Sequence, residues 1–407
     1  MLRNPALLTL WGGEFASRIG ESIFQIALLW YLLELTESSL HTGVVTMISY
    51  LPAFVVGVWA GVVVDRLDYR RVLLAANLCR IALAAGIPLL FLAGAPPVAG
   101  IAAMGFLISG ATAFFNPARD AIIPLLARRG ELLGANSLVQ SAWQFSLVIG
   151  PLLAAAGAEF LPTVHLFFGV SLAFAFSLLV LLRLGLRGLL APPDGAPAES
   201  ALATAPPGGF FAEFRGGLGY LWSERRVFWI WIITLLNNFF LMGPVFVGMP
   251  VYVRSYLGGT FRDYGLIEAT YAGGMIVATW LIGRFGARFN PLHVLFLALI
   301  YDGLTYVPLL WVTTVKGTLL IILIHSLGIP AITISRITAL HRIVPQALQG
   351  RVFSYFHLAV AGMTALSIGV VGVVLTRLPA NQLFAAIGML SASCGVLGLL
   401  LPVFRKG

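Results

Sequence analysis

The stretch "GVVVDRLDYRR", residues 61–71, places two acids and three arginines between two apolar runs. The runs on either side, near 41–64 and 71–94, are each long enough to cross a bilayer, which takes about 20 mostly apolar residues. A short charged stretch between two such runs is a connection at a membrane surface. The rest of the chain is therefore interpreted with the bilayer as its solvent.

Composition extends this interpretation to the whole chain. Of the 407 residues, 59% are hydrophobic and 10% are charged, and the mean hydropathy is +0.95, all outside the range of soluble domains. The runs do not alternate apolar and polar residues as barrel strands do, so the spans are expected to be helices. We predict an all-α membrane protein with twelve spans, near residues 7–33, 41–64, 71–94, 98–117, 131–158, 163–186, 226–252, 263–284, 290–312, 317–340, 350–375 and 379–403.

The net charge of +9 follows membrane topology and does not indicate a nucleic-acid partner. With twelve spans both termini lie on one side, and most of the Lys and Arg residues then fall on the connections of that side, as the positive-inside rule requires. We predict a multi-pass protein of the bacterial cytoplasmic (inner) membrane with both termini in the cytoplasm. The apolar N-terminal run is too long for a cleavable signal and is expected to remain as the first span.

The two cysteines of the chain, Cys79 and Cys394, lie in separate spans far apart in sequence. This spacing suggests neither a disulfide framework nor a metal site, and no cofactor is predicted.

The two halves of the chain resemble each other. Arg66 in the opening stretch corresponds to Arg284, and Arg119 corresponds to Arg336, with offsets of 284 − 66 = 218 and 336 − 119 = 217. A nearly constant offset over two separate segments is hard to obtain by chance. The sequence therefore predicts an internal repeat.

A segment rich in Ala, Pro and Gly divides the predicted spans six and six. We expect an N-terminal half at 1–188, a cytoplasmic linker with an interfacial helix at 189–222, and a C-terminal half at 223–407. Repeats of six spans keep the same orientation, so the halves are parallel repeats. That arrangement is typical of transporters, in which the substrate site lies near the membrane midplane between the halves.

The opening stretch also fits the signature G-x-x-x-D-R-x-x-x-R-R that the major facilitator superfamily carries between its second and third spans. The chain resembles this family over nearly its whole length. The signature positions are taken by Gly61, Asp65, Arg66, Arg70 and Arg71. One departure is Asp68-Tyr69, where the family often has a glycine.

The resemblance implies that this loop is a cytoplasmic gate, in which Asp65 accepts hydrogen bonds from Arg66 or Arg119. Arg336, the counterpart of Arg119, is expected to anchor the cytoplasmic end of span ten. The competing interpretation is that the basic loop only fixes the topology, although topology alone would not need Asp65. The second half has Gly283 in place of this acid, so the gate would be asymmetric.

Within the superfamily, "VIGPLLA" (148–154) and "RIVPQALQGRVFS" (342–354) are similar to the branch of macrolide efflux proteins and the enterobactin exporter. The lysophospholipid transporter is a more distant member of that branch. The similarity implies an exporter or a lipid mover and leaves the substrate open.

The first span contains three charges in "EFASRIGE", at Glu14, Arg18 and Glu21. At the α-helical spacing all three share one face and can pair. A charge at the centre of a spanning helix costs roughly 2.5–3.5 kcal/mol, so this face is expected to point into the bundle or a watery cavity. Two interpretations stay open for Glu14 and Glu21: a structural ion-pair chain with Arg18, or a site that binds substrate and titrates a proton.

Other polar side chains lie within later spans. The repeat offset gives Glu21 the counterpart Asn238 (21 + 217 = 238), beside Asn237 on the seventh span, where both suit a cavity wall. Asp302 on span nine either bonds a neighbouring helix or takes part in transport. His325 on span ten is expected to be a hydrogen-bonded packing residue.

These features favour a secondary active exporter of amphipathic, drug- or siderophore-like small molecules. It would work by alternating access with proton antiport, and Glu21 would alternately hold a proton and substrate. The alternative is a lysophospholipid or other lipid flippase, with Arg18 near a head-group phosphate. The chain lacks the H-E-x-x-H, G-x-S-x-G and G-x-x-x-x-G-K-[ST] motifs, so neither an enzyme nor an ATP-driven pump is predicted. The expected partners are the substrate, membrane lipids and protons, and a monomer is expected.

Overall fold

The structure is a computed structural model that describes residues 4–64, 67–94, 97–127, 132–183 and 219–404. Regular structure in these ranges is helical, with no strand, as the sequence predicts. The chain divides into two compact units. The first unit comprises Met1–Asp194 with Val253–Ala269, and the second comprises Gly195–Tyr252 with Thr270–Gly407.

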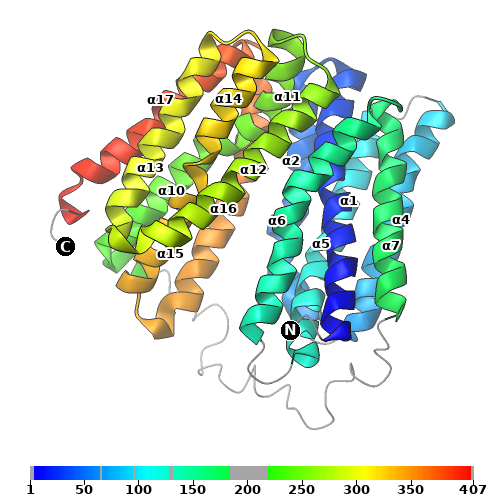
Figure 1. The fold of residues 1–407 in the computed structure, drawn as a ribbon, viewed down its shortest axis with the longest axis horizontal. Coiled ribbons are helices and arrows are strands. Elements are labelled where there is room, and N and C mark those ends of the chain that lie inside the picture. The colour runs from blue at the N-terminus through cyan, green and yellow to red at the C-terminus, as the bar shows by residue number, and fades with distance from the viewer. Residues whose placement is uncertain (1–3, 65–66, 95–96, 128–131, 184–218, 405–407) are drawn as a thin grey trace. The chain divides into compact units, whose positions relative to one another are not determined.

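The first unit is a bundle in which α1 packs against both α6 and α7, while α5 packs against α2 and α4 (Figure 1). Its helices are α1 (Pro5–Thr36), α2 (Ser39–Val55), α3 (Gly57–Val64), α4 (Tyr69–Leu92), α5 (Val98–Leu126), α6 (Leu132–Gly157), η1 (Thr163–His165) and α7 (Leu166–Arg183).

In the second unit, α13 packs against α15 and α17, and α10 packs against α16 and α17. The long elements, of which α12 begins in the first unit, are α10 (Arg225–Gly243), α12 (Phe261–Phe285), α13 (Pro291–Tyr306), α14 (Val315–Ser326), α15 (Ile329–Ile343), α16 (Gln346–Val374) and α17 (Ala380–Leu400). The short elements, of which η3 lies in the first unit except for Tyr252, are η2 (Pro244–Gly248), α11 (Met249–Val251), η3 (Tyr252–Tyr256), η4 (Gly286–Arg288), η5 (Val307–Leu310) and η6 (Pro402–Phe404).

Eleven helical segments within the described ranges are long and apolar enough to cross a membrane, so the chain is a multi-pass membrane protein. The predicted second span is not among them because it consists of two helices, α2 and α3, of 17 and 8 residues. They meet at Val56, whose backbone stays helical and whose N–H donates to the carbonyl oxygen of Pro52 at 2.8 Å. The proline itself has no N–H to donate, which weakens the helix at this point.

Local sequence fixes where the first helix begins. Asn4 stands before α1, and its side-chain oxygen accepts hydrogen bonds from the N–H groups of Ala6 (3.1 Å) and Leu7 (3.3 Å). Pro5 takes the first helical position, where a missing N–H costs nothing. The Asn4 amide also donates to the carbonyl oxygen of Leu126 at 3.0 Å, which joins the start of α1 to the end of α5.

Small residues allow a close helix contact in the second unit. A side-chain carbon added to Gly303 on α13 would lie 2.3 Å from the Gly388 carbonyl oxygen, and one added to Gly388 on α17 would lie 2.5 Å from the Gly303 carbonyl oxygen. The two backbones therefore touch, as small residues permit in membrane bundles. This contact fixes α13, the helix that carries Asp302.

Candidate functional site

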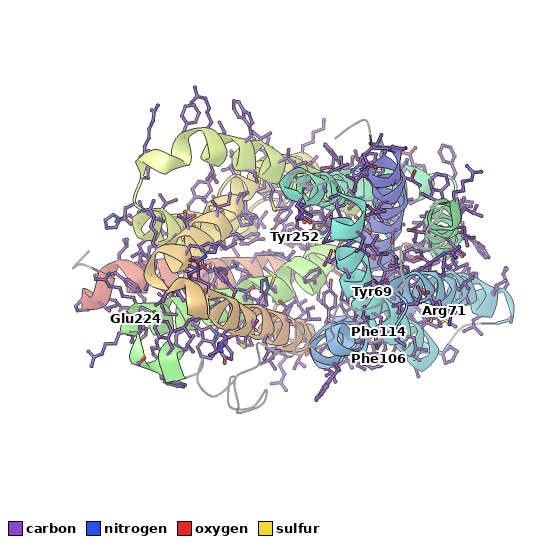
Figure 2. The ribbon with its side chains drawn as sticks, turned by 90° about the horizontal axis from the view of Figure 1, so that it is seen from below. Tyr69, Arg71, Phe106, Phe114, Glu224 and Tyr252 are labelled. Carbon is purple, nitrogen blue, oxygen red and sulfur yellow. The ribbon has the colours of Figure 1, made fainter. Side chains whose placement is uncertain are left out.

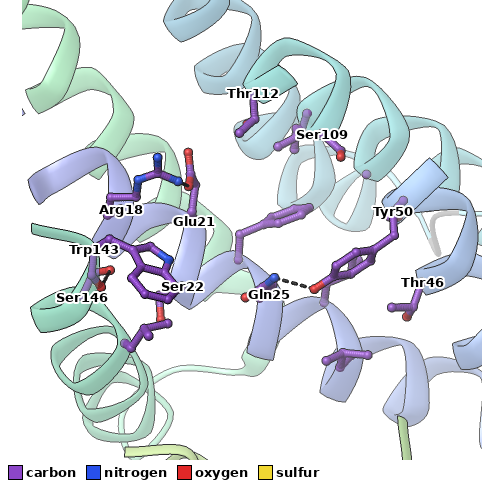
Figure 3. Close-up of a pocket in the computed structure, with 17 residues that line it drawn as sticks. Arg18, Glu21, Ser22, Gln25, Thr46, Tyr50, Ser109, Thr112, Trp143 and Ser146 are labelled. Carbon is purple, nitrogen blue, oxygen red and sulfur yellow. Dashed lines mark hydrogen bonds and ion pairs between the residues drawn. The ribbon is translucent and has the colours of Figure 1, made fainter. Parts of the chain in front are cut away.

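A cavity of about 240 Å³ opens in the first unit among α1, α2, α5 and α6 (Figure 3). Its polar wall includes Arg18 and Glu21 of α1, Tyr50 of α2 and Trp143 of α6. Its apolar wall is formed by Phe24, Leu28, Leu29, Ile108 and Leu147. The cavity thus joins an ionic edge to apolar and aromatic walls, a combination that suits an amphipathic molecule, and its volume is just below the roughly 300 Å³ at which ligand pockets usually begin.

The three charges of α1 share one face and pair with each other, as their spacing predicts. Arg18 Nε donates to Glu14 Oε1 and Arg18 Nη1 donates to Glu21 Oε2, both at 2.7 Å. The Glu14 side chain is 2% exposed, whereas that of Glu21 is 21% exposed. Glu21 is therefore the carboxylate that the cavity can reach.

The other oxygen of Glu21 is held by an arginine from a different helix. Arg80 of α4 donates from Nη1 to Glu21 Oε1 at 2.8 Å, and its side chain is fully buried. Its guanidinium carbon lies 4.1 Å from the ring centroid of Phe115 and 4.6 Å from that of Phe174, which is cation–π geometry. Arg80 also donates to Asn77 Oδ1 on its own helix. Glu21 is thus clamped between two cations.

Arg80 is not among the residues predicted from the sequence. A charge within the apolar run of the third span is the same signal that singles out Arg18, so Arg80 could have been found in that way.

Two residues of α5 extend the cluster on the side of Glu14. Arg119 donates from Nη1 to Glu14 Oε1 and, at 3.2 Å, to Asn116 Oδ1, which also accepts from Arg18 Nη2 at 2.8 Å. Arg119 further pairs with Asp120 at 2.8 Å, but the Asp120 side chain is 61% exposed. The cluster therefore joins three guanidinium groups to the carboxylates of Glu14 and Glu21 and to the exposed carboxylate of Asp120.

The cluster retains unused bonding capacity. Within the described residues, Glu14 Oε2 and Arg80 Nε are buried and have no hydrogen-bond partner. A buried polar atom without a partner costs about 1–3 kcal/mol. A rearrangement that gives these atoms partners would therefore recover free energy.

Uncharged polar side chains complete the cavity of the first unit. Gln25 Nε2 donates to the Tyr50 hydroxyl at 2.5 Å, which joins α1 to α2 across the cavity wall (Figure 3). Ser109 and Thr112 of α5 also line it. These groups can orient the polar part of a bound molecule.

The polar residues predicted in the second half line one small cavity of about 90 Å³ in the second unit. They are Asn237 and Asn238 of α10, Asp302 of α13, His325 of α14 and Arg336 of α15. Both asparagine amides donate within the bundle, that of Asn237 to Ser391 Oγ at 3.0 Å and that of Asn238 to the Thr234 carbonyl oxygen at 2.9 Å. Arg336 lies in α15 beside this cavity, 343 − 336 = 7 residues before the helix ends at Ile343, and its expected role as an anchor of that end stays a prediction.

Asp302 contacts a neighbouring helix. His325 Nε2 lies 3.5 Å from Asp302 Oδ1, and both side chains are 1% exposed. Thr305 Oγ1 lies 2.9 Å from the opposite imidazole nitrogen, and the Tyr306 ring centroid lies 3.9 Å from that of the imidazole. The contact agrees with the interpretation that Asp302 bonds a neighbouring helix and with a packing role of His325. A transport role of Asp302 stays a prediction.

The charged loop is described only in part. Asp65 and Arg66 lie outside the described residues, and Gly61 falls within α3. The expected gate around Asp65 therefore stays a prediction. Among described residues, Arg119 contacts Glu14, Asn116 and Asp120.

The departure from the loop signature has a structural role. Asp68 precedes α4, and its Oδ1 accepts from the N–H groups of Arg70 at 2.8 Å and Arg71 at 3.2 Å. Asp68 is therefore the cap of the helix that carries Arg80. The Arg71 side chain, at the first turn of α4 beside Tyr69 (Figure 2), is 88% exposed and lies 3.8 Å from Asp68.

Solved structures of transporters share this fold. A bacterial homologue of the iron transporter ferroportin aligns with a TM-score of 0.75 and 16% identity, covering 99% of this chain and 98% of that one. A bacterial homologue of the human lysosomal transporter Spinster aligns with a TM-score of 0.70 and 14% identity, covering 98% and 96%. At these identities the likeness shows the fold alone.

Sequence relatives include efflux proteins. The multidrug efflux pump Tap of Mycolicibacterium fortuitum is 27% identical over 423 residues, covering 99% of this chain and 97% of that protein. Macrolide efflux protein A of Streptococcus pyogenes is 26% identical over 280 residues, covering 68% of this chain and 66% of that protein, just under two thirds of its length.

The sequence profile of the Major Facilitator Superfamily matches residues 10–368. The match covers most of the chain, and it agrees with the loop signature, the helical fold and the transporters to which the chain is similar. The chain therefore belongs to the Major Facilitator Superfamily, a family of membrane transporters and not of enzymes.

Proposed function

We propose that this chain exports amphipathic, drug-like small molecules by alternating access in exchange for protons. It would do so across the bacterial inner membrane, with both termini in the cytoplasm. The observation that carries the proposal is the placement of Glu21, a carboxylate at the edge of a cavity that also has apolar and aromatic walls. The names of the relatives, a multidrug efflux pump and a macrolide efflux protein, support the direction and the class of substrate.

The pairing of Glu21 with two arginines supports proton antiport. In the described state Arg18 and Arg80 occupy both carboxylate oxygens. When Arg18 moves away, one oxygen becomes free to take either a proton or the cationic group of a substrate. Because the two compete for one carboxylate, binding of one favours release of the other, which is the simplest form of antiport.

Ligand binding to the purified full-length protein tests this proposal. A ligand that binds the folded state raises the unfolding temperature, so ethidium and erythromycin are compared with lysophosphatidylethanolamine at pH 6 and pH 8. We expect the cationic compounds to stabilise the protein more at pH 8 and Glu21→Gln to abolish that difference. Glu159→Gln is the matched control, because Glu159 is exposed and pairs with Arg262 at 2.8 Å. Equal pH dependence in Glu21→Gln would contradict the role of Glu21.

A lysophospholipid flippase is the second candidate, and one observation favours it. The cluster holds three guanidinium groups, those of Arg18, Arg80 and Arg119, against the carboxylates of Glu14 and Glu21 and the exposed carboxylate of Asp120. Arg18 lines the cavity beside its apolar walls, and a guanidinium group there suits the phosphate of a lipid that carries a single acyl chain. Stabilisation by the lysophospholipid alone, without pH dependence, would favour the flippase over the exporter.

A further inference from the structure

A groove that is larger than the cavity around Glu21 lies on the second unit. It measures about 900 Å³ and is bounded by the end of α12, by α13 and by α15. Its apolar side chains are exposed, Phe285 by 43%, Phe289 by 61% and Leu297 by 57%. The groove shares no residue with the cavity around Glu21. Ligand sites usually have volumes of about 300–1,000 Å³, and the volume of this groove lies at the upper end of that range.

One end of the groove is basic. Arg342, in the last turn of α15, lines it. The guanidinium groups of Arg284 and Arg288 lie 5.6 Å and 5.9 Å from the ring centroid of Phe285, another lining residue. In the part of the chain that the structure describes, none of the three arginines pairs with a carboxylate.

Chain direction explains why these arginines gather at one membrane surface. Helix α12 ends at Phe285, α13 begins at Pro291 and α15 ends at Ile343, so all three termini belong to the same end of the bundle. Basic residues at helix C-termini also complement the helix dipole. Topology and dipoles account for the charge, but they do not account for an apolar groove that runs to it.

We propose that this groove binds an anionic phospholipid of the surrounding bilayer. One acyl chain lies along the apolar wall, and the head-group phosphate lies among Arg284, Arg288 and Arg342. Charge complementarity selects this occupant over a zwitterionic lipid, because three guanidinium groups without a carboxylate partner among the described residues attract net negative charge at a membrane surface. The inference rests on the groove and its charges and does not depend on the proposed transport activity.

Native mass spectrometry of the detergent-purified full chain tests the head-group contact. Phosphatidylglycerol and phosphatidylcholine with identical acyl chains are titrated, and we expect tighter retention of phosphatidylglycerol.

A double variant tests the arginines. Each arginine near a membrane surface contributes about a fivefold factor in affinity for anionic lipid, so Arg288→Gln with Arg342→Gln is expected to weaken the binding of phosphatidylglycerol about 25-fold. Arg377→Gln is the matched control. Arg377 is exposed and follows the C-terminal end of α16, whereas the arginines of the groove lie at the end of the bundle where α16 begins.

A second variant tests the acyl-chain contact. Ile334 lines the groove from α15, so Ile334→Trp fills it while it leaves the arginines in place. We expect weaker retention of both lipids. Unfolding temperatures in detergent without added lipid verify that all variants fold.

Three results of these lipid titrations would overturn the assignment. These are equal affinity of the native protein for the two lipids, an equal loss of phosphatidylglycerol in Arg377→Gln, and unchanged retention in Ile334→Trp. Displacement of phosphatidylglycerol by erythromycin or ethidium would also overturn it, since the groove would then be a substrate route.

Discussion

Arg80, whose side chain is fully buried, donates to Glu21 Oε1 at 2.8 Å and links α4 to the face of α1 that lines the cavity of the first unit. Breaking a buried ion pair by removal of one partner is costly because the other charge stays buried. The pair therefore contributes to the fold and to the candidate site at the same time.

Glu21→Ala is expected to destabilise the protein by about 3–5 kcal/mol, because Arg80 would remain buried without this partner. Arg80→Met is expected to cost less, since Glu21 keeps Arg18 at 2.7 Å and is partly exposed. The double variant is expected to be more stable than Glu21→Ala, because no guanidinium is then left unpaired at position 80. Urea unfolding in detergent measures the three differences, and additive effects of the two single changes would contradict the coupling.

Asp68→Ala is expected to cost about 1 kcal/mol, because it removes the cap of α4. Asp68→Asn keeps an accepting oxygen and is expected to be nearly neutral. Arg71→Gln is expected to be neutral as well, since the Arg71 side chain is 88% exposed. A large loss of thermal stability in Arg71→Gln would show that this arginine has a structural contact that its exposure does not suggest.

Gly388→Val is expected to prevent folding of the second unit or to destabilise it strongly. An added side-chain carbon at this position would lie 2.5 Å from the backbone carbonyl oxygen of Gly303, and a backbone atom cannot move away as a flexible side chain can. Gly273→Val on α12 is the control, because no heavy atom lies within 4 Å of a carbon added there. Size-exclusion profiles and unfolding temperatures compare the two, and equal behaviour would contradict the close contact of α13 and α17.

His325→Leu is expected to destabilise the protein by about 1–3 kcal/mol, because Asp302 would lose its partner while it remains buried. Replacing both residues by Leu is expected to recover part of that loss, since no buried carboxylate would then be left without its imidazole partner. A double variant that is less stable than either single variant would show that the pair does not account for the burial of Asp302.

Residues that depend on helix periodicity could be predicted from the sequence. The spacing of Glu14, Arg18 and Glu21 alone places them on one face, and the structure confirms that they pair. The repeat offset identifies Asn238 and Arg336, which line the same cavity of the second unit.

Features that depend on packing between helices could not be predicted. Arg80 joins Glu21 only because α4 lies beside α1, and no local pattern gives the distance between them. The contact between Asp302 and His325 likewise requires α13 and α14 to lie side by side. The division of the second span into α2 and α3 at Val56 escapes prediction because an apolar run that contains a proline can still form one continuous span.

Transport in proteoliposomes tests the central claim most directly. A pH gradient, acidic inside, is imposed on vesicles that contain the native protein, Glu21→Gln or Glu159→Gln, and ethidium accumulation is followed by fluorescence. The account predicts that the native protein and Glu159→Gln accumulate ethidium and release it when nigericin collapses the gradient, whereas Glu21→Gln does not accumulate it. Accumulation by Glu21→Gln at the native rate, or ethidium movement that ignores the gradient, would contradict proton-coupled export through Glu21.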